Sequence, residues 1–189
     1  MPPRGDPLTG GERGLGVTGS IAAYKAADLV SAVVKRGLGV TVVLTQGASA
    51  FIGPLTLATL SRRPVVTDLF APAGTGIEHV DLSERADVML VAPATANVLA
   101  KLALGLADDA LTTTALALKR RTPLLVAPAM NTRMWKHPAT LENLDRLKAR
   151  GVIVIPPAEG VLACGTEGWG KLVAIETLVA ALEEALNRA

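Results

Sequence analysis

The fold is decided at Gly16-Val17-Thr18-Gly19-Ser20, where a short apolar strand turns directly into a helix. Leu15 to Thr18 has the composition of a strand, and Ile21 to Lys35 carries apolar residues at helical spacing before Gly37, a natural C-cap. The first amides of a helix have no partner within it and therefore attract anions. The turn predicts a phosphate-binding site at the end of the first strand.

The same alternation of strand and helix continues along the chain. Val40 to Thr45 is a β-branched run typical of strands that are buried on both faces. Further strands are expected at Val88 to Ala92, Leu124 to Ala127 and Val152 to Ile155, and helices near Ala96 to Leu106, Asp109 to Leu118, Pro138 to Arg150 and Ala174 to Arg188. Because no hairpin signal separates the strands, parallel pairing with right-handed crossovers is expected. The predicted fold class is α/β, a single domain with a doubly wound parallel sheet covered by helices on both faces.

Length and charge narrow the class of protein. The chain has 189 residues, half of them apolar, which is enough for one core. Its 19 basic and 17 acidic side chains nearly cancel and form no basic run with interleaved aromatic residues, so no nucleic acid partner is expected. The longest apolar stretches fall far short of the roughly 20 residues of a membrane helix, so no membrane association is expected.

The first residues and the cysteine content indicate the compartment. Residues 1–13 hold prolines, glycines and scattered charges without periodicity or an apolar signal core. We predict a disordered N-terminal tail over 1–13 and a domain over 14–189. Cys164 is the only cysteine, which excludes an intrachain disulfide and favours a cytoplasmic location.

Unusual residues follow the predicted strands. They are Gly19-Ser20, Thr45, Pro93 to Asn97 and Pro128 to Trp135. In doubly wound sheets, ligands bind beyond the carboxyl ends of the strands, where loops diverge and helices begin. These residues are therefore the candidates for function, and residues that precede strands are candidates for stability.

Gly14 to Gly19 matches the dinucleotide-binding fingerprint G-x-G-x-x-G, but the surrounding sequence does not fit a dinucleotide site. The glycines would lie within the first strand rather than after it, and Thr45-Gln46-Gly47 stands where an acidic residue should bind a ribose. Hydroxyls at Ser20 and Thr45 suit a monophosphate instead. A tight turn with an N-capping serine and no ligand remains the alternative at this point.

Three loops together carry a family resemblance. They read PATANV at Pro93 to Val98, PAMNTRMW at Pro128 to Trp135 and GVLACGTEGWGK at Gly160 to Lys171. From about Gly16 to its end the chain thereby resembles the homo-oligomeric flavin-containing cysteine decarboxylases, whose PASANT, PxMNxxMW and LACG motifs these match. The resemblance implies a Rossmann-like or flavodoxin-like fold and the cofactor FMN. It is strongest to the bacterial branch that converts 4′-phosphopantothenoyl-cysteine to 4′-phosphopantetheine and carbon dioxide in coenzyme A biosynthesis.

The resemblance also implies roles for three residues. His79, fourteen residues before the first motif, would act as a base or orienting donor near the flavin and the leaving carboxylate. Asn131 would donate its amide to that carboxylate. Cys164 would protonate the enethiolate left after decarboxylation, a role open to a thiol that is mainly protonated at neutral pH.

Binding residues are implied in the same way, and no metal ligand is among them. The FMN contacts would be Gly19, Ser20, Ile21, Thr45, Thr95, Ala96, Asn97, Val98 and Met130. The substrate contacts would be Asn131, Val161, Leu162 and Ala163. The chain departs from the family pattern at Val98, Trp169 and Lys171, of which the last replaces an arginine and loses its bidentate fork.

Alternatives within the family remain open, as do the partners. A peptidyl-cysteine decarboxylase and a non-catalytic flavoprotein regulatory subunit are the competing functions. The resemblance implies a homo-oligomer, either a trimer or a dodecamer of trimers, with the site shared across a subunit boundary. In bacteria a phosphopantothenoylcysteine synthetase domain usually follows this one, so a fused domain or a separate synthetase is an expected partner.

Overall fold

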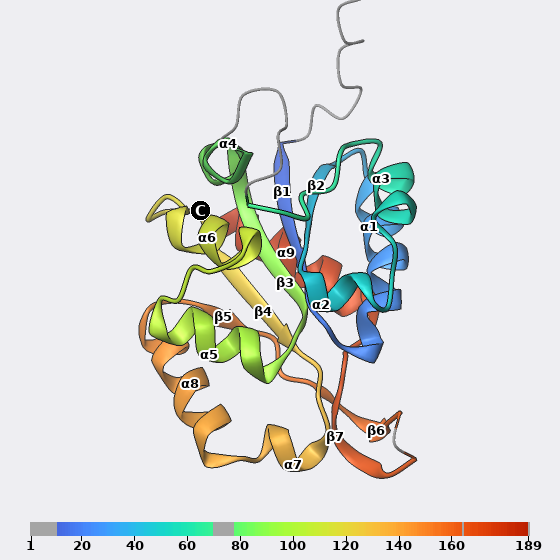
Figure 1. The fold of residues 1–189 in the computed structure, drawn as a ribbon, viewed down its shortest axis with the longest axis vertical. Helices are drawn as coiled ribbons and strands as arrows, with labels where there is room; N and C mark the ends of the chain where they lie inside the picture. Colours follow the sequence, from blue (N-terminus) through green and yellow to red (C-terminus); the bar gives the residue numbers. More distant parts are fainter. Residues whose placement is uncertain (1–10, 70–77, 164, 189) are drawn as a thin grey trace, which may run out of the picture.

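A five-stranded parallel sheet forms the centre of the molecule, and its strand order is β2-β1-β3-β4-β5. The computed structural model describes residues 11–69, 78–163 and 165–188. The strands are β1 (Glu12–Val17), β2 (Gly39–Leu44), β3 (Ala86–Ala94), β4 (Leu124–Pro128) and β5 (Ile153–Val154) (Figure 1). The predicted α/β class with a doubly wound parallel sheet is therefore confirmed.

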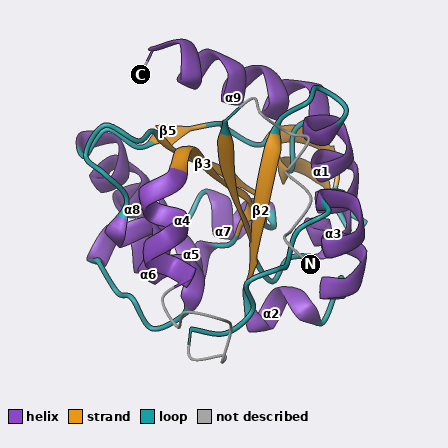
Figure 2. Cartoon of the chain, turned by 90° about the horizontal axis from the view of Figure 1, so that it is seen from above, coloured by secondary structure: helices purple, strands orange, loops and turns teal. Residues whose placement is uncertain are grey.

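Helices cover both faces of the sheet. One face is covered by α1 (Ala26–Val34), α3 (Pro54–Ser61) and α9 (Ile175–Arg188), and the 3-10 turn η1 (Ile21–Lys25) leads into α1. The other is covered by α4 (Glu78–Arg85), α5 (Ala96–Leu104), α6 (Ala110–Ala117) and α8 (Pro138–Ala149). The short helices α2 (Gln46–Ser49) and α7 (Thr132–Trp135) follow β2 and β4. Figure 2 shows the strands between the two groups of helices.

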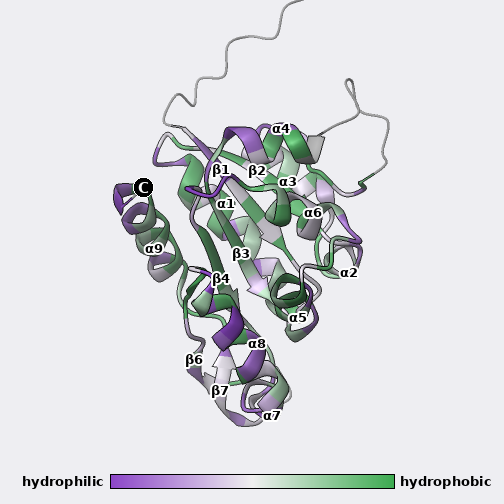
Figure 3. Cartoon of the chain, turned by 90° about the vertical axis from the view of Figure 1, so that its left-hand side faces the viewer, coloured by the Kyte–Doolittle hydropathy of each residue, from purple (hydrophilic) through white to green (hydrophobic). Residues whose placement is uncertain are grey.

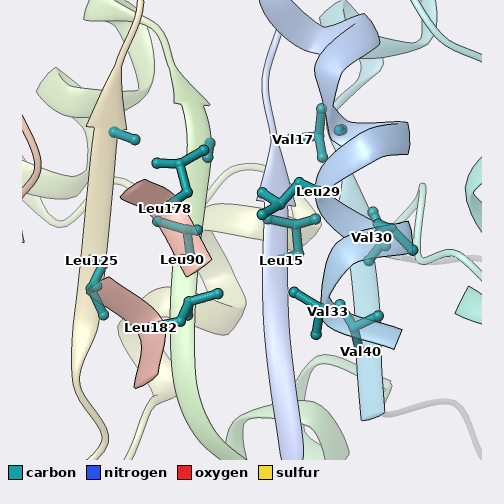
Figure 4. Close-up of a cluster of buried hydrophobic side chains, with 14 of the residues drawn as sticks. Leu15, Val17, Leu29, Val30, Val33, Val40, Leu90, Leu125, Leu178 and Leu182 are labelled. Carbon is teal, nitrogen blue, oxygen red and sulfur yellow. The ribbon is translucent and has the colours of Figure 1, made fainter. Parts of the chain in front are cut away.

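The strands are apolar throughout because alternate side chains fill two separate cores. Along β3, Leu90 belongs to the core under α1 and α9, whereas Met89 and Val91 belong to the core under α5, α6 and α8. Figure 4 shows Leu90 in the first core together with Leu29 of α1 and Leu178 of α9. In Figure 3 the strands of the central sheet are coloured mostly green, the colour of hydrophobic residues.

The glycines in β1 that match the dinucleotide-binding fingerprint are packing residues. Gly14 and Gly16 lie inside β1, as predicted, rather than in a loop after it. A Cβ atom on Gly16 would collide with the side chain of Leu111 of α6. Gly16 therefore allows a helix to approach the sheet closely, and the motif needs no ligand to explain it.

The structure moves the start of the first strand. β1 begins at Glu12, so Glu12 and Arg13 belong to the sheet and not to the expected tail, of which residues 1–10 lie outside the described residues. Both side chains are buried, and the carboxylate of Glu12 pairs with Arg63. Two charged residues were mistaken for a loop because nothing in the local sequence indicates their partners.

The largest difference from prediction is an antiparallel hairpin near the C-terminus. β6 (Ala158–Val161) pairs with β7 (Glu167–Lys171) in the segment that the sequence indicated as a glycine-punctuated loop. Its alternation of polar and small residues gives no strand signal. Helices α2 and α7 were also not predicted, because each has only four residues, and the eight-residue helices α3 and α4 were missed as well.

Among the described residues, no helix combines the length and the apolar character needed to cross a membrane.

Candidate functional site

The strand order reverses between β1 and β3, and ligands of doubly wound sheets bind at such a reversal. The buried Thr18 ties the two strand ends together. Its Oγ1 donates to the carbonyl of Pro93 at 2.7 Å and accepts from the amide of Thr95 at 3.0 Å. Sequence reasoning missed this residue, although a hydroxyl directly after a strand was a usable signal.

The turn after β1 packs against the helix that follows β2. The Oγ of Ser20 caps η1 by accepting from the amide of Ala22 at 3.3 Å, and it donates to the carbonyl of Ala129 at 3.4 Å. A Cβ atom on Gly19 would come within 2.9 Å of the backbone of Gly47. Only glycine permits that approach, so this turn has a geometric reason for its sequence.

Two further hydroxyls cap helices at the same edge. The Oγ1 of Thr45 accepts from the amide of Ala48 at 3.3 Å at the start of α2, and it donates to the carbonyl of Val17 at 3.2 Å. The Oγ1 of Thr95 accepts from the amide of Val98 at 3.3 Å at the start of α5. With Ser20, three hydroxyl-capped helix starts meet at the ends of β1, β2 and β3. Each cap occupies only one amide of its helix start, and the other first-turn amides, which have no partner within the helix, fit the phosphate of FMN.

A cavity of about 570 Å³ opens beside this edge, a size typical of small-molecule sites. Ser20 and the η1 residues Ile21, Ala22, Tyr24 and Lys25 form one part of its lining, and Ala129 to Asn131 form another. The third part comes from the β6–β7 hairpin and the residues beside it. The structure thus brings together the following predicted residues: Ser20, Ile21, Met130, Asn131, Val161, Leu162 and Ala163.

The hairpin is fastened to the loop that carries Asn131. The amide of Met130 donates to the carbonyl of Gly170 at 3.0 Å, and the Oγ1 of Thr132 donates to the carbonyl of Trp169 at 2.7 Å. Gly170 has φ +135°, and a Cβ atom there would collide with the carbonyl oxygen of Met130. Glycine is therefore required where the hairpin meets the site. Trp169, one of the departures from the family pattern, contributes its backbone to this contact.

Asn131 caps α7 and still offers donors. Its Oδ1 accepts from the amide of Met134 at 2.9 Å, and the side chain is exposed. Because the cap uses only the oxygen, the Nδ2 amide remains available to a ligand carboxylate. Cys164 lies outside the described residues, but its neighbours Ala163 and Gly165 belong to the turn that joins β6 to β7.

Not every predicted residue reaches the cavity. Gly19, Thr45 and Thr95 to Val98 lie at the same edge of the sheet but do not line it. The side chain of Val98 is 3% exposed and packs in the second core, while its amide is bound to Thr95. Val98 is therefore placed as a core residue, which leaves neither its side chain nor its N–H for a cofactor.

His79 belongs to α4, and its side chain is outside what the structure describes. Because α4 leads directly into β3, it stands at the amino edge of the sheet. Figure 1 shows α4 at one end of the molecule and α7 with the β6–β7 hairpin at the other. Within one copy of the chain, the helix of His79 is thus remote from Asn131. In the described part of the chain, no three His, Cys, Asp or Glu side chains gather as a metal site.

The flavoprotein family model matches residues 7–187 of the chain. The chain is 46% identical over 173 residues to the "Probable phosphopantothenoylcysteine decarboxylase" of Streptococcus mutans serotype c, covering 91% of this chain and 97% of that protein. It is 47% identical over 169 residues to the coenzyme A biosynthesis bifunctional protein CoaBC of Bacillus subtilis, covering 89% of this chain. That alignment spans 41% of the bifunctional protein.

Two solved structures share the fold over nearly the whole chain. A PPC decarboxylase, solved as a cysteine-to-serine mutant complexed with pantothenoylaminoethenethiol, superposes with a TM-score of 0.82 at 31% identity, covering 92% of this chain and 97% of that one. The FMN-dependent cysteine decarboxylase SpaF superposes with a TM-score of 0.83 at 34% identity, covering 96% and 98%. Both identities are high enough to extend the likeness from fold to family.

Proposed function

The chain belongs to the flavoprotein family, and from that membership we propose that it is an FMN-dependent carboxy-lyase. Its substrate is 4′-phosphopantothenoyl-L-cysteine, and its products are 4′-phosphopantetheine and carbon dioxide, in coenzyme A biosynthesis. The observation that carries this proposal is the single cavity that joins η1, the Asn131 loop and the hairpin, in a chain close to phosphopantothenoylcysteine decarboxylases over nearly its whole length. The cytoplasm is its proposed location.

The residues at the carboxyl edge would hold FMN in two parts. Gly19, Ser20 and Ile21, with Thr45 and the first residues of α5, Thr95 to Asn97, bind the phosphate through amides and hydroxyls. Met130 borders the cavity, where the flavin ring would lie. When bound, FMN supplies the electron sink without which a cysteine carboxylate does not lose carbon dioxide.

The chain's own groups orient the substrate and move protons. Asn131 directs Nδ2–H donors at the carboxylate while its Oδ1 stays fixed by the cap of α7. An uncharged donor holds the carboxylate without stabilising its charge as a cation would, so the group can still leave as carbon dioxide. Cys164 carries on Sγ the proton that the decarboxylated enethiolate takes up. Val161, Leu162 and Ala163 enclose the substrate from the hairpin.

A shared site explains the position of His79. Because α4 stands at the far end of the sheet, His79 acts at the flavin of a second copy, in a homo-oligomer built from trimers. Leu106 and Leu116 are 52% and 62% exposed and border one apolar depression, as expected of a surface that another copy covers. A synthetase is proposed as a further partner, because the CoaBC relatives are more than twice as long as the matched region.

The proposal is tested by purification of the chain, its visible spectrum and an assay of carbon dioxide release. We expect a yellow protein that decarboxylates 4′-phosphopantothenoyl-cysteine. The likeness to SpaF favours a second candidate, a cysteine decarboxylase that acts on peptides, so a peptide ending in cysteine is assayed in parallel. Turnover of the peptide alone would establish that candidate, and a yellow protein inert towards both would point to a regulatory flavoprotein.

A further inference from the structure

The cavity has a cationic lining. Two lysines, Lys25 and Lys171, border it, and among the residues that the structure describes no aspartate or glutamate does. Lys25 is the last residue of η1, on the wall that begins at Ser20. Lys171 is the last residue of β7, on the hairpin wall. Residues 146 positions apart in the sequence thus place two positive charges at one cavity.

Neither lysine is neutralised by a neighbour in the described part of the chain. Other lysines are paired: Lys101 with Asp108 and Asp109, and Lys119 with Glu84. No such ion pair involves Lys25 or Lys171. Two uncompensated cations beside a cavity raise the local concentration of anions and favour an anionic ligand.

The side chain of Lys171 lies across the β6–β7 hairpin. A Cβ atom on Gly160 would lie 3.3 Å from Cδ and 3.7 Å from Nζ of Lys171. The lysine side chain therefore crosses the hairpin over a position without a side chain of its own. Gly160 leaves room for this path, and Lys171 itself borders the cavity.

The other anionic groups at the site are already assigned to residues other than the two lysines. The phosphate of FMN is assigned to amides and hydroxyls at the ends of β1, β2 and β3, and the substrate carboxylate to Asn131. A substrate that carries a phosphomonoester brings one more group, with nearly two negative charges at neutral pH. A lysine ammonium binds such a group as a point charge and needs no bidentate geometry.

The structure assigns Lys25 and Lys171 to the phosphate of the substrate, as the residues that make the site specific for a phosphorylated cysteine derivative. This assignment rests on the proposed function and deepens it. It also accounts for Lys171 in place of the arginine of the family pattern, because a point charge can bind the phosphate without a bidentate fork. A peptide substrate would leave both cations without a partner.

Steady-state kinetics with two substrates test the assignment. The FMN-loaded protein and the variants Lys25→Met and Lys171→Met are compared on 4′-phosphopantothenoyl-cysteine and on pantothenoyl-cysteine, which lacks the phosphate. Each variant is expected to raise KM for the phosphorylated substrate about tenfold, with kcat and both constants for pantothenoyl-cysteine nearly unchanged. Lys35→Met, at an exposed lysine just after α1, is the matched control and should change neither substrate.

Equal KM changes for the two substrates, or none, would overturn the assignment. Calorimetry separates it from the proposed function, because it needs no turnover. 4′-Phosphopantetheine and pantetheine are titrated into each FMN-loaded protein, and wild type should bind the phosphorylated compound more tightly. If carbon dioxide is never released but this preference exists and is lost in Lys25→Met, the decarboxylase proposal fails and the phosphate site stands. A preference that is absent, or that survives both substitutions, refutes the site.

Discussion

Asn131 combines two functions in one side chain, and the two can be separated by substitution. Its Oδ1 caps α7, which leaves its Nδ2 to donate to a ligand. Asn131→Asp keeps the cap but replaces a donor by a charge that repels the substrate carboxylate. We expect decarboxylation to fall at least ~100-fold with no loss of thermal stability.

Asn131→Ala is the complementary variant. It removes the cap as well as the donor, so the free energy of unfolding should also fall by about 1 kcal/mol. Thermal unfolding and carbon dioxide release, measured on both variants, distinguish the functions. Full activity in Asn131→Asp would show that Asn131 is only a helix cap.

Cys164 gives a second prediction at this scale. Cys164→Ser replaces a proton donor of ordinary thiol acidity by a hydroxyl that is far less acidic. We expect about one equivalent of carbon dioxide per active site and then arrest, because the enethiolate is not protonated. The measurement is rapid-quench counting of carbon dioxide against enzyme. Continued turnover at the wild-type rate would remove the thiol from the mechanism.

Residues were predicted unevenly from the sequence. Ser20, Met130, Asn131 and the Val161 to Ala163 segment were found because motifs mark them, and they do share one cavity. Thr18 and Lys25 were missed for a physical reason: a buried threonine and a helical lysine look ordinary until their neighbours are known. The assigned roles of the three catalytic candidates stay predictions.

At the scale of elements, the β6–β7 hairpin depends on one glycine. Gly170→Ala places a methyl group against the carbonyl of Met130 at φ +135°. We expect the hairpin to lose its contact with residues 130–132, so that KM rises. The free energy of unfolding should fall by about 1–3 kcal/mol. Gly53→Ala is the control, because Gly53 has φ −76° and open space around its Cα atom. Unchanged kinetics in Gly170→Ala would show that the hairpin does not hold the substrate.

The start of α6 predicts a pH dependence. Burial alone would raise the pKa of Asp109, but hydrogen bonds from Thr112 and from Lys101 outweigh it and hold that pKa below its ordinary value. A lowered folded-state pKa stabilises the protein above the unfolded value of about 3.9, and the contribution is lost as pH falls through the folded value. Asp109→Asn keeps the cap without the titration.

The measurement is the thermal midpoint from pH 6 to pH 3. At pH 6 the wild type should have the higher midpoint, which corresponds to a free energy of unfolding larger by about 1 kcal/mol or less than that of Asp109→Asn. This difference should disappear as the pH falls below about 4. Parallel curves for the two proteins would show that Asp109 does not link stability to pH.

Elements with an apolar pattern were predicted well, and most short ones were not. Strands β1 to β5 and helices α1, α5, α6, α8 and α9 were all expected, because burial in the two cores leaves apolar runs in the sequence. The hairpin leaves none, since its glycines and polar residues are chosen for docking to residues 130–132. Tertiary contact decides such segments, and a single sequence does not display it.

At the scale of the whole molecule, the exposed leucines predict assembly. Light scattering should give a multiple of the 19.5 kDa chain mass, and Leu116→Glu should lower it by placing a charge in the apolar depression shared with Leu106. Leu116→Met keeps the apolar surface and should leave the mass unchanged. Activity is expected to fall with the assembly if, as proposed, His79 acts at the flavin of another copy. A monomer with full activity would contradict the shared site.

The lining of the cavity comes from three parts of the chain: Ser20 with residues of η1, residues 129–131, and residues 161–163 with 170–172. An occupant that contacts all three links the first helix of the chain to its last hairpin without a covalent bond. If the protein were expressed as two fragments, divided between β3 and β4, each would hold only part of the lining. Ligand would then strengthen the reassembly of the halves, and fragment complementation would report binding in living cells without any assay of the chemistry.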